Sequence, residues 1–239
     1  KDIQSGSLMR VLVLTSTCLR HKSFASIVIK KCRALGYEVM CIFESKDYNS
    51  MNNEYKELCF YKDTTSVIDN HCLTSCEEGS INSKKIVDAI KDYDPDIGLV
   101  FGTSILKERV FGAPKAGCYN VHTGLVQHYR GVENVTWPLV QKEYDKIGFT
   151  VHKVSPGIDN GKVILQRKIS PKYFYDPYRM FLHVCKAGTE TLVENLEKIC
   201  KNEIETLDIK PSGKLYRKKD SFENMEKIAR QNLYEFNTR

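Results

Sequence analysis

Long hydrophobic runs are missing from this sequence of 239 residues. Its longest apolar stretches resemble Ile97 to Phe101 in length, whereas a helix that spans a bilayer needs about 20 apolar residues. Residues 1–8 are polar and lack the apolar core of a signal peptide. We therefore expect no membrane segment and predict a cytoplasmic protein, with residues 1–8 as a ragged remnant outside the fold.

Metal-binding spacing is also missing among the nine cysteines. Cys72 and Cys76 are four positions apart, but no second pair of cysteines or histidines completes a zinc set. Cys41 and Cys118 lie within apolar patterns, where a thiol packs as a small hydrophobic group. The odd count without a secretion signal favours free thiols in a reducing compartment. We expect no metal site.

Positive charge is present without a strong concentration. The net charge is +6, and lysine and arginine are spread along the chain with one cluster at residues 217–219. Such a balance suits a phosphate-bearing small molecule. It is too weak to indicate a nucleic-acid-binding protein, so we expect no nucleic-acid partner. Tyr216 and the basic cluster after it are interpreted as a solvated tail, with contact to an acceptor phosphate as the alternative.

Apolar strands alternate with amphipathic helices over the first hundred residues. The patterns predict strands at 10–16, 38–44 and 97–102, a helix at 23–35, and a helix at 83–91 that Asn82 caps. Residues 47–80 are polar and poorly periodic, which indicates a long excursion. This alternation is typical of an α/β fold whose mostly parallel central sheet is flanked by crossover helices.

The second half predicts a strand, a hairpin and a helical tail. The strand covers 118–122, and the hairpin joins 147–154 to 162–169 through a turn at 156–161. Helices are expected at 134–144, 176–201 and 222–233. Trp137 is expected either in the core or over the site, and His152 is interpreted as a structural residue within its strand.

Three polar side chains stand out against this framework. Asn120 and His122 are two positions apart in a predicted strand, so they share one face of the sheet. Asp159 lies between two glycines, where a tight turn can carry it towards them. An amide donor, an imidazole and an orienting carboxylate suit chemistry at a carbonyl carbon. The alternatives are a satisfied strand end and an aspartate that merely closes its turn.

Four ordered segments resemble the formyltransferase family that uses 10-formyltetrahydrofolate. They are residues 99–106 (LVFGTSIL), 120–125 (NVHTGL), 129–131 (YRG) and 148–165 (GFTVHKVSPGIDNGKVIL). The resemblance implies a Rossmann-like fold with a catalytic trio at Asn120, His122 and Asp159. The proline-containing turn that follows the histidine in the family is replaced here by residues 125–128.

The same resemblance implies where the folate co-substrate lies. Its pterin is expected against two loops, which contain Phe101, Gly102, Ser104, Ile105 and Leu106 in the first and Pro156, Gly157 and Ile158 in the second. We assign residues 9–200 to the catalytic domain and residues 201–239 to a C-terminal extension. A homodimer that uses the exposed tail is left open.

The acceptor amine is predicted from departures within the family. Glycinamide ribonucleotide enzymes grip a phosphate with a glycine loop after the first strand, but residues 15–22 contain no glycine. Methionyl-tRNA formyltransferases carry a longer C-terminal domain. These departures favour an amino sugar attached to a nucleotide. The side chains expected to line the acceptor site are Arg20, His21, Lys22, Thr123, Tyr129 and Arg130.

Other functions remain open from the sequence alone. The runner-up readings are a glycinamide ribonucleotide formyltransferase and a formyltetrahydrofolate hydrolase, in which water replaces the amine. A third is a catalytically silent module that binds folate or a nucleotide.

Overall fold

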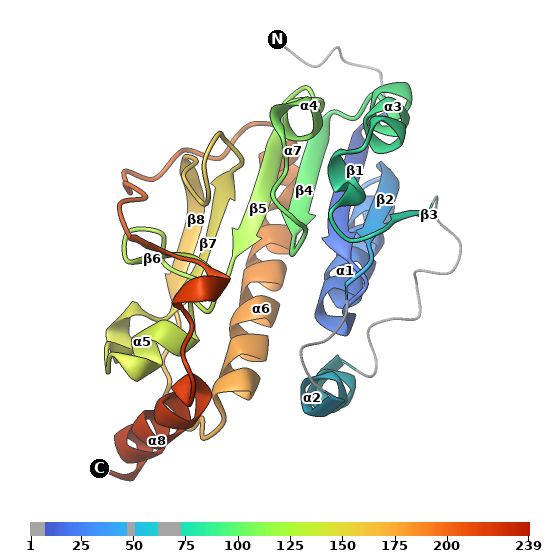
Figure 1. The fold of residues 1–239 in the computed structure, drawn as a ribbon. Helices are drawn as coiled ribbons and strands as arrows, with labels where there is room; N and C mark the ends of the chain where they lie inside the picture. The colour runs from blue at the N-terminus through green and yellow to red at the C-terminus, as the bar shows by residue number, and fades with distance from the viewer. Residues whose placement is uncertain (1–7, 47–50, 62–72) are drawn as a thin grey trace.

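A seven-stranded sheet forms the centre of the computed structural model, which describes residues 8–46, 51–61 and 73–239. The strand order is β3-β2-β1-β4-β5-β7-β8 (Figure 1). The strands are β1 (Arg10–Ser16), β2 (Glu38–Glu44), β3 (Leu73–Cys76), β4 (Ile97–Phe101), β5 (Cys118–His122), β7 (Gly148–Lys153) and β8 (Val163–Lys168). The strands from β3 to β5 are parallel, and β7 and β8 add an antiparallel hairpin. The predicted α/β fold is confirmed.

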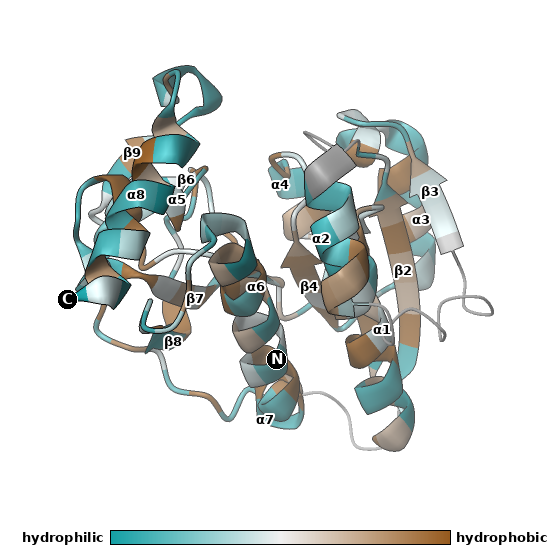
Figure 2. Cartoon of the chain, turned by 90° about the horizontal axis from the view of Figure 1, so that it is seen from below, coloured by the Kyte–Doolittle hydropathy of each residue, from teal (hydrophilic) through white to brown (hydrophobic). Residues whose placement is uncertain are grey.

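Helices cover both faces of the sheet because the buried strands are apolar on both sides. Val11 and Val13 of β1 pack into the cluster that contains α1 (Leu19–Ala34) and α6 (Pro177–Glu194). Leu12 and Leu14 point the other way, into the cluster that contains α3 (Lys84–Tyr93). Figure 2 shows the hydrophobic strands β2 and β4 between helices with hydrophilic outer faces.

A buried ion pair ties α2 (Met51–Tyr61) to the start of α1. The Glu57 carboxylate is fully buried and accepts hydrogen bonds from the Arg20 guanidinium and from the Tyr178 hydroxyl, the latter at 2.6 Å. Burial lowers the pKa of Arg20, but Glu57, helped by Cys185, Cys18 and Tyr178, outweighs burial and holds that pKa above its usual value. Helices α1, α2 and α6 therefore meet at the buried Glu57 carboxylate, whose charge Arg20 neutralises.

Further helices and two short strands lie between and after these elements. They are α4 (Glu108–Phe111), β6 (Tyr129–Gly131), α5 (Thr136–Val140), α7 (Leu196–Cys200), β9 (Lys214–Tyr216) and α8 (Met225–Thr238). Strands β6 and β9 pair in parallel as a separate two-stranded sheet. Within the described ranges, no helix is long and apolar enough to cross a membrane, and the described cysteines are free thiols.

Several element predictions need correction at their ends. Helix α1 begins at Leu19 rather than at residue 23, and the helix expected at 176–201 breaks at Asn195. Ser83, not Asn82, occupies the cap position of α3, because the Asn82 side chain instead binds the backbone of Ile105 and Lys107.

Two further corrections concern the second half of the chain. The helix expected at 134–144 shortens to five residues in α5. Tyr216 is not a solvated tail residue, since its ring is 3% exposed and stacks on Trp137 at 4.2 Å. Residues 217–219 are exposed, as expected. Of the remnant at 1–8 and the excursion at 47–80, residues 1–7, 47–50 and 62–72 lie outside the described residues.

The Arg20–Glu57 pair leads to a stability prediction. Glu57→Gln keeps the side-chain shape and removes the charge, so we expect the free energy of unfolding to fall by about 3 kcal/mol as the arginine loses its counter-charge. Urea denaturation measures the loss. Lys84→Ala, which removes the exposed pair with Asp88, should leave the free energy of unfolding nearly unchanged. Equal effects of the two variants would contradict the prediction.

Candidate active site

Strand β5 presents Asn120 and His122 on one face of the sheet. Tyr119, which precedes Asn120, and Val121, which lies between Asn120 and His122, point into the core beneath α6. Because side chains alternate along a strand, Asn120 and His122 project from the opposite face. Their placement is rigid, since β5 has hydrogen-bonded neighbours on both sides, β4 and β7.

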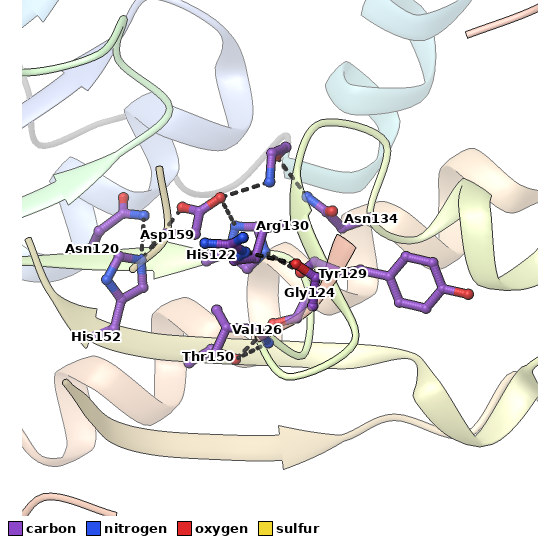
Figure 3. Close-up of polar contacts among 12 residues, drawn as sticks. Asn120, His122, Gly124, Val126, Tyr129, Arg130, Asn134, Thr150, His152 and Asp159 are labelled. Atoms are coloured by element: carbon purple, nitrogen blue, oxygen red, sulfur yellow. Dashed lines mark hydrogen bonds and ion pairs between the residues drawn. The ribbon is translucent and has the colours of Figure 1, made fainter. Parts of the chain in front are cut away.

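The turn between β7 and β8 carries Asp159 back over this face (Figure 3). Asp159 has a φ of 46°, a left-handed conformation that aspartate tolerates better than most residues. Its Oδ2 lies 3.3 Å from His122 Nδ1 and accepts the Gly131 N–H at 2.8 Å. Three segments far apart in the sequence thus converge on one carboxylate.

His152 belongs to the same cluster, which sequence reasoning missed. It lies directly opposite Asn120 in the β5–β7 register, and its Nε2 is 3.2 Å from Asn120 Nδ2 and 3.5 Å from Asp159 Oδ1. Its Nδ1 donates to the Lys153 carbonyl at 3.0 Å, so in the neutral ring Nε2 accepts from the Asn120 amide. When the ring is protonated, Nε2 instead donates towards Asp159 Oδ1. The sequence held no signal for this, because only the antiparallel pairing of β5 with β7 places His152 beside Asn120.

The two nitrogens of His122 have different partners. Nε2 is 3.1 Å from the Tyr129 carbonyl oxygen, which can only accept, so Nε2 carries a proton in the neutral ring. Nδ1 is therefore the atom that gains or releases a proton, and it faces Asp159. Burial lowers the pKa of His122 and Asp159 raises it, with a net result below the usual value.

The charge of Asp159 is stabilised by its surroundings. Burial raises the pKa of this carboxyl, but His122, His152 and the Gly131 N–H together outweigh burial and lower the pKa to about 2. The carboxylate is therefore charged at neutral pH and favours a proton on His122 Nδ1.

The loop that follows His122 is held against the sheet. Thr150, opposite His122 in the register, donates its hydroxyl to the Gly124 carbonyl at 2.7 Å. A Cβ at Gly124 would lie 2.7 Å from His122 Nε2, so a glycine at this position lets the loop pass close to the imidazole.

The loop after β4 is clamped by three polar side chains. The fully buried Glu44 accepts from the Ser104 N–H at 2.6 Å, and Lys46 donates to the Gly102 carbonyl at 2.8 Å. Asn82 donates to the Ile105 carbonyl at 2.9 Å. Backbone groups that were expected to meet the pterin are thus engaged within the protein, while the Ile105 side chain is 70% exposed. In this loop Phe101 is buried and Leu106 half-buried.

The second loop expected at the folate site is more open. Pro156 and Gly157 are exposed, and Ile158 is half-buried. Gly157 has a φ of 98°, which only glycine adopts without strain. The positions of these residues allow contact with a ligand over Asp159.

Two of the three cations predicted at the acceptor site have partners within the fold. Arg20 pairs with Glu57, and His21 is buried with its Nδ1 2.5 Å from the Ser16 hydroxyl. The His21 ring also fills the space over Gly102, where a Cβ would lie 2.1 Å from it. Burial first, then Arg20 and Lys46, lower the pKa of His21 well below its usual value. Lys22 is half-buried.

The remaining predicted acceptor residues line the loop of His122. Thr123 and Arg130 are half-buried, and Arg130 Nε donates to the Gly213 carbonyl at 2.8 Å. Tyr129 is buried, and its hydroxyl donates to the Glu143 carboxylate and lies 2.8 Å from Gln141 Oε1. Trp137 is also buried, in a cluster with Tyr129, Tyr216 and Met225. No group of potential metal ligands occurs in the part of the chain that the structure describes.

A family model described as "Formyl transferase" matches residues 9–196. The chain belongs to the formyl transferase family. Methionyl-tRNA formyltransferase from Kosmotoga olearia is 33% identical over 126 residues, which cover 52% of this chain and 40% of that relative. The chain thus spans less than half the length of this curated relative.

Two solved structures resemble this formyl transferase in fold. A sugar N-formyltransferase from Shewanella sp. has a TM-score of 0.64 at 16% identity, covering 95% of this chain and 88% of that one. Glycinamide ribonucleotide transformylase 1 from Symbiobacterium toebii has a TM-score of 0.63 at 16% identity, covering 87% of this chain and 99% of that one. At these identities the likeness concerns the fold.

The low pKa of Asp159 leads to a prediction about acid stability. Because the folded pKa of about 2 lies below the unfolded value, Asp159 stabilises the fold fully above about pH 4, and this contribution disappears as the pH falls through about 2. We expect the wild type to lose about 2 kcal/mol of unfolding free energy over that range that Asp159→Asn does not lose. Urea denaturation at each pH measures both proteins, and parallel curves would contradict the assignment.

Proposed function

We propose that this chain transfers a formyl group from 10-formyltetrahydrofolate to an amine. The observation that carries the proposal is the meeting of His122 Nδ1 with Asp159 Oδ2 at 3.3 Å, beside an asparagine amide on the same face. Membership of the formyl transferase family supports the reaction class. A folate donor is supported by two solved structures of similar fold. They are the sugar 3N-formyl transferase WlaRD in the presence of 5-N-formyl-THF and the formyltransferase PseJ from Anoxybacillus kamchatkensis in complex with tetrahydrofolate.

Asn120 acts as a hydrogen-bond donor to the formyl oxygen. As the amine attacks the formyl carbon, negative charge develops on that oxygen, and a fixed N–H group stabilises it without reorganisation. An amide nitrogen has two N–H groups, and His152 Nε2 accepts one of them. His152 therefore orients the amide, and the second N–H serves the substrate.

His122, with Asp159 beside it, accepts the proton that the attacking amine loses. The attacking amine must lose a proton as the new carbon–nitrogen bond forms, and the folate nitrogen must gain one as the old bond breaks. Neutral His122 accepts a proton at Nδ1, where the Asp159 carboxylate stabilises the resulting imidazolium. The lowered pKa of His122 keeps the ring neutral near pH 7 and ready for this step.

The acceptor that we favour is an amino sugar attached to a nucleotide. Support comes from the absence of glycine between residues 15 and 22 and from the fold shared with a sugar N-formyltransferase. Aminoacyl-tRNA is the competing acceptor, since the curated relative named above is a methionyl-tRNA formyltransferase. Lys22, Thr123 and Arg130, which are half-buried, are the proposed acceptor contacts.

Substitution of Asn120 and of His122 tests their proposed roles. We expect Asn120→Ala to lower kcat about a hundredfold or more, because one donor to the developing oxyanion is lost. His122→Ala should abolish measurable transfer. Product formation from 10-formyltetrahydrofolate is followed with the best acceptor. His183→Ala, at an exposed histidine on α6, is the matched control and should retain wild-type rates. Equal rates for all three variants would refute the assignment.

A panel of acceptors distinguishes the candidate substrates. The purified chain is incubated with 10-formyltetrahydrofolate and, separately, a nucleotide-linked amino sugar, glycinamide ribonucleotide, methionyl-tRNA or no amine. We expect formamide product with the amino sugar at the highest kcat/KM. Formate release without an amine would instead identify a hydrolase, and binding without turnover would identify a silent module.

A further inference from the structure

The segment from Glu203 to Arg217 runs from the end of α7 to the site, without helix, as a strap. In Figure 1 it crosses above the β7–β8 hairpin and descends beside β6. It contacts both segments that place Asp159. The Leu207 N–H donates to the Val163 carbonyl at 2.8 Å, where β8 leaves the Asp159 turn, and β9 pairs with β6.

Strand β6 holds the His122–Asp159 pair from both ends. The Tyr129 carbonyl accepts from His122 Nε2, and the Gly131 N–H donates to Asp159 Oδ2. Each of these backbone groups belongs to a residue that pairs with the strap, Tyr129 with Lys214 and Gly131 with Tyr216. A shift of the strap therefore moves the two anchors of the pair.

The strap and the loop of His122 are in unusually close backbone contact. The Gly213 N–H donates to the Val126 carbonyl at 3.0 Å, and the Lys214 N–H donates to the His128 carbonyl at 3.2 Å. A Cβ at Gly213 would lie 2.4 Å from the His128 carbonyl carbon and 2.6 Å from the Tyr129 nitrogen. Only glycine permits this approach, because the clashing atoms are backbone.

Aromatic packing fixes the other end of the contact. The buried Tyr216 ring lies between Trp137, at 4.2 Å, and Tyr129, at 5.8 Å, in stacked arrangements. Its hydroxyl accepts a hydrogen bond from Gln141 at 2.9 Å. The strap is thus anchored by its backbone and by a side chain inserted beside the site.

We propose that the strap is a positioning element of the catalytic site, with Gly213 and Tyr216 as positioning residues that act through β6 on His122 and Asp159. This inference rests on the proposed function. Residues that lie outside 9–196, the range that the family model matches, thereby help to position the reacting groups.

Two strap variants and one control test this inference. Gly213→Ala forces the strap away from β6, and Tyr216→Leu removes the stacked ring while leaving the backbone free to pair. Gly36→Ala is the control, since Gly36 has a φ of 73° but no atom within 4 Å of an added Cβ. It introduces backbone strain far from the site without the steric clash that an added Cβ meets at Gly213. Thermal unfolding ranks the stability of the three proteins.

The decisive readout is the titration of His122, followed by NMR of labelled histidine, because it does not depend on turnover. Burial lowers the pKa of this ring most, Asp159 and the Tyr129 carbonyl raise it, and His152 lowers it. Because the strap holds Asp159 and the Tyr129 carbonyl through β6, the His122 pKa should shift from its wild-type value in both strap variants, while Gly36→Ala leaves it unchanged.

Turnover then separates this inference from the proposed function. We expect kcat at neutral pH to fall at least tenfold in the strap variants, with KM for folate within about twofold of wild type. If the wild type itself transfers no formyl group, the proposed function fails, yet the titration still tests the strap. Wild-type His122 titration in a folded strap variant would overturn the inference, as would failure of both variants to fold, which would make the strap a general folding element.

Discussion

Burial of the Asp159 carboxylate is the constraint on which the rest of the site depends. Its side chain is 11% exposed, and a charge removed from water is tolerated only where donors and positive groups replace the solvent. The Gly131 N–H donates to the carboxylate, and His122 and His152, from two other segments, supply positive charge when their rings are protonated. The fold must therefore bring β5, β6 and the β7–β8 turn together before the carboxylate can be charged and useful.

The sheet and the loops contribute differently to this arrangement. Strand β5 is fixed by neighbours on both sides, so Asn120 and His122 are placed with the precision of a hydrogen-bonded ladder. Asp159 comes from a turn with a left-handed backbone, whose position depends on what it touches. The residues Asn120 and His122, fixed on the sheet, thus face a carboxylate on a turn, and β6 and the strap behind it set the place of that carboxylate.

The sequence predicted the parts of the molecule that local patterns determine. Apolar periodicity defined β1, β2 and β5 to the residue, and the turn glycines located the hairpin. The convergence of Asn120, His122 and Asp159 followed from strand alternation together with the family resemblance. These properties depend on short-range geometry, which a single sequence records directly.

Long-range pairing explains what sequence reasoning missed. His152 joins the site only because β7 pairs antiparallel with β5, and the sequence around His152 does not indicate that pairing. Tyr216 was interpreted as part of a basic tail, but Trp137 of α5 and Tyr129 of β6, both distant in the sequence, bury its ring. Arg20 and His21 looked free to bind a phosphate, yet Glu57 and Ser16 engage them once the helices pack.

The most direct measurement is a crystal structure of this chain bound to a stable analogue of 10-formyltetrahydrofolate. The account predicts that the formyl oxygen lies within hydrogen-bonding distance, about 3 Å, of Asn120 Nδ2, with the carbon over the His122–Asp159 pair. A folate bound elsewhere, or one whose formyl group points away from all three side chains, would contradict the central claim.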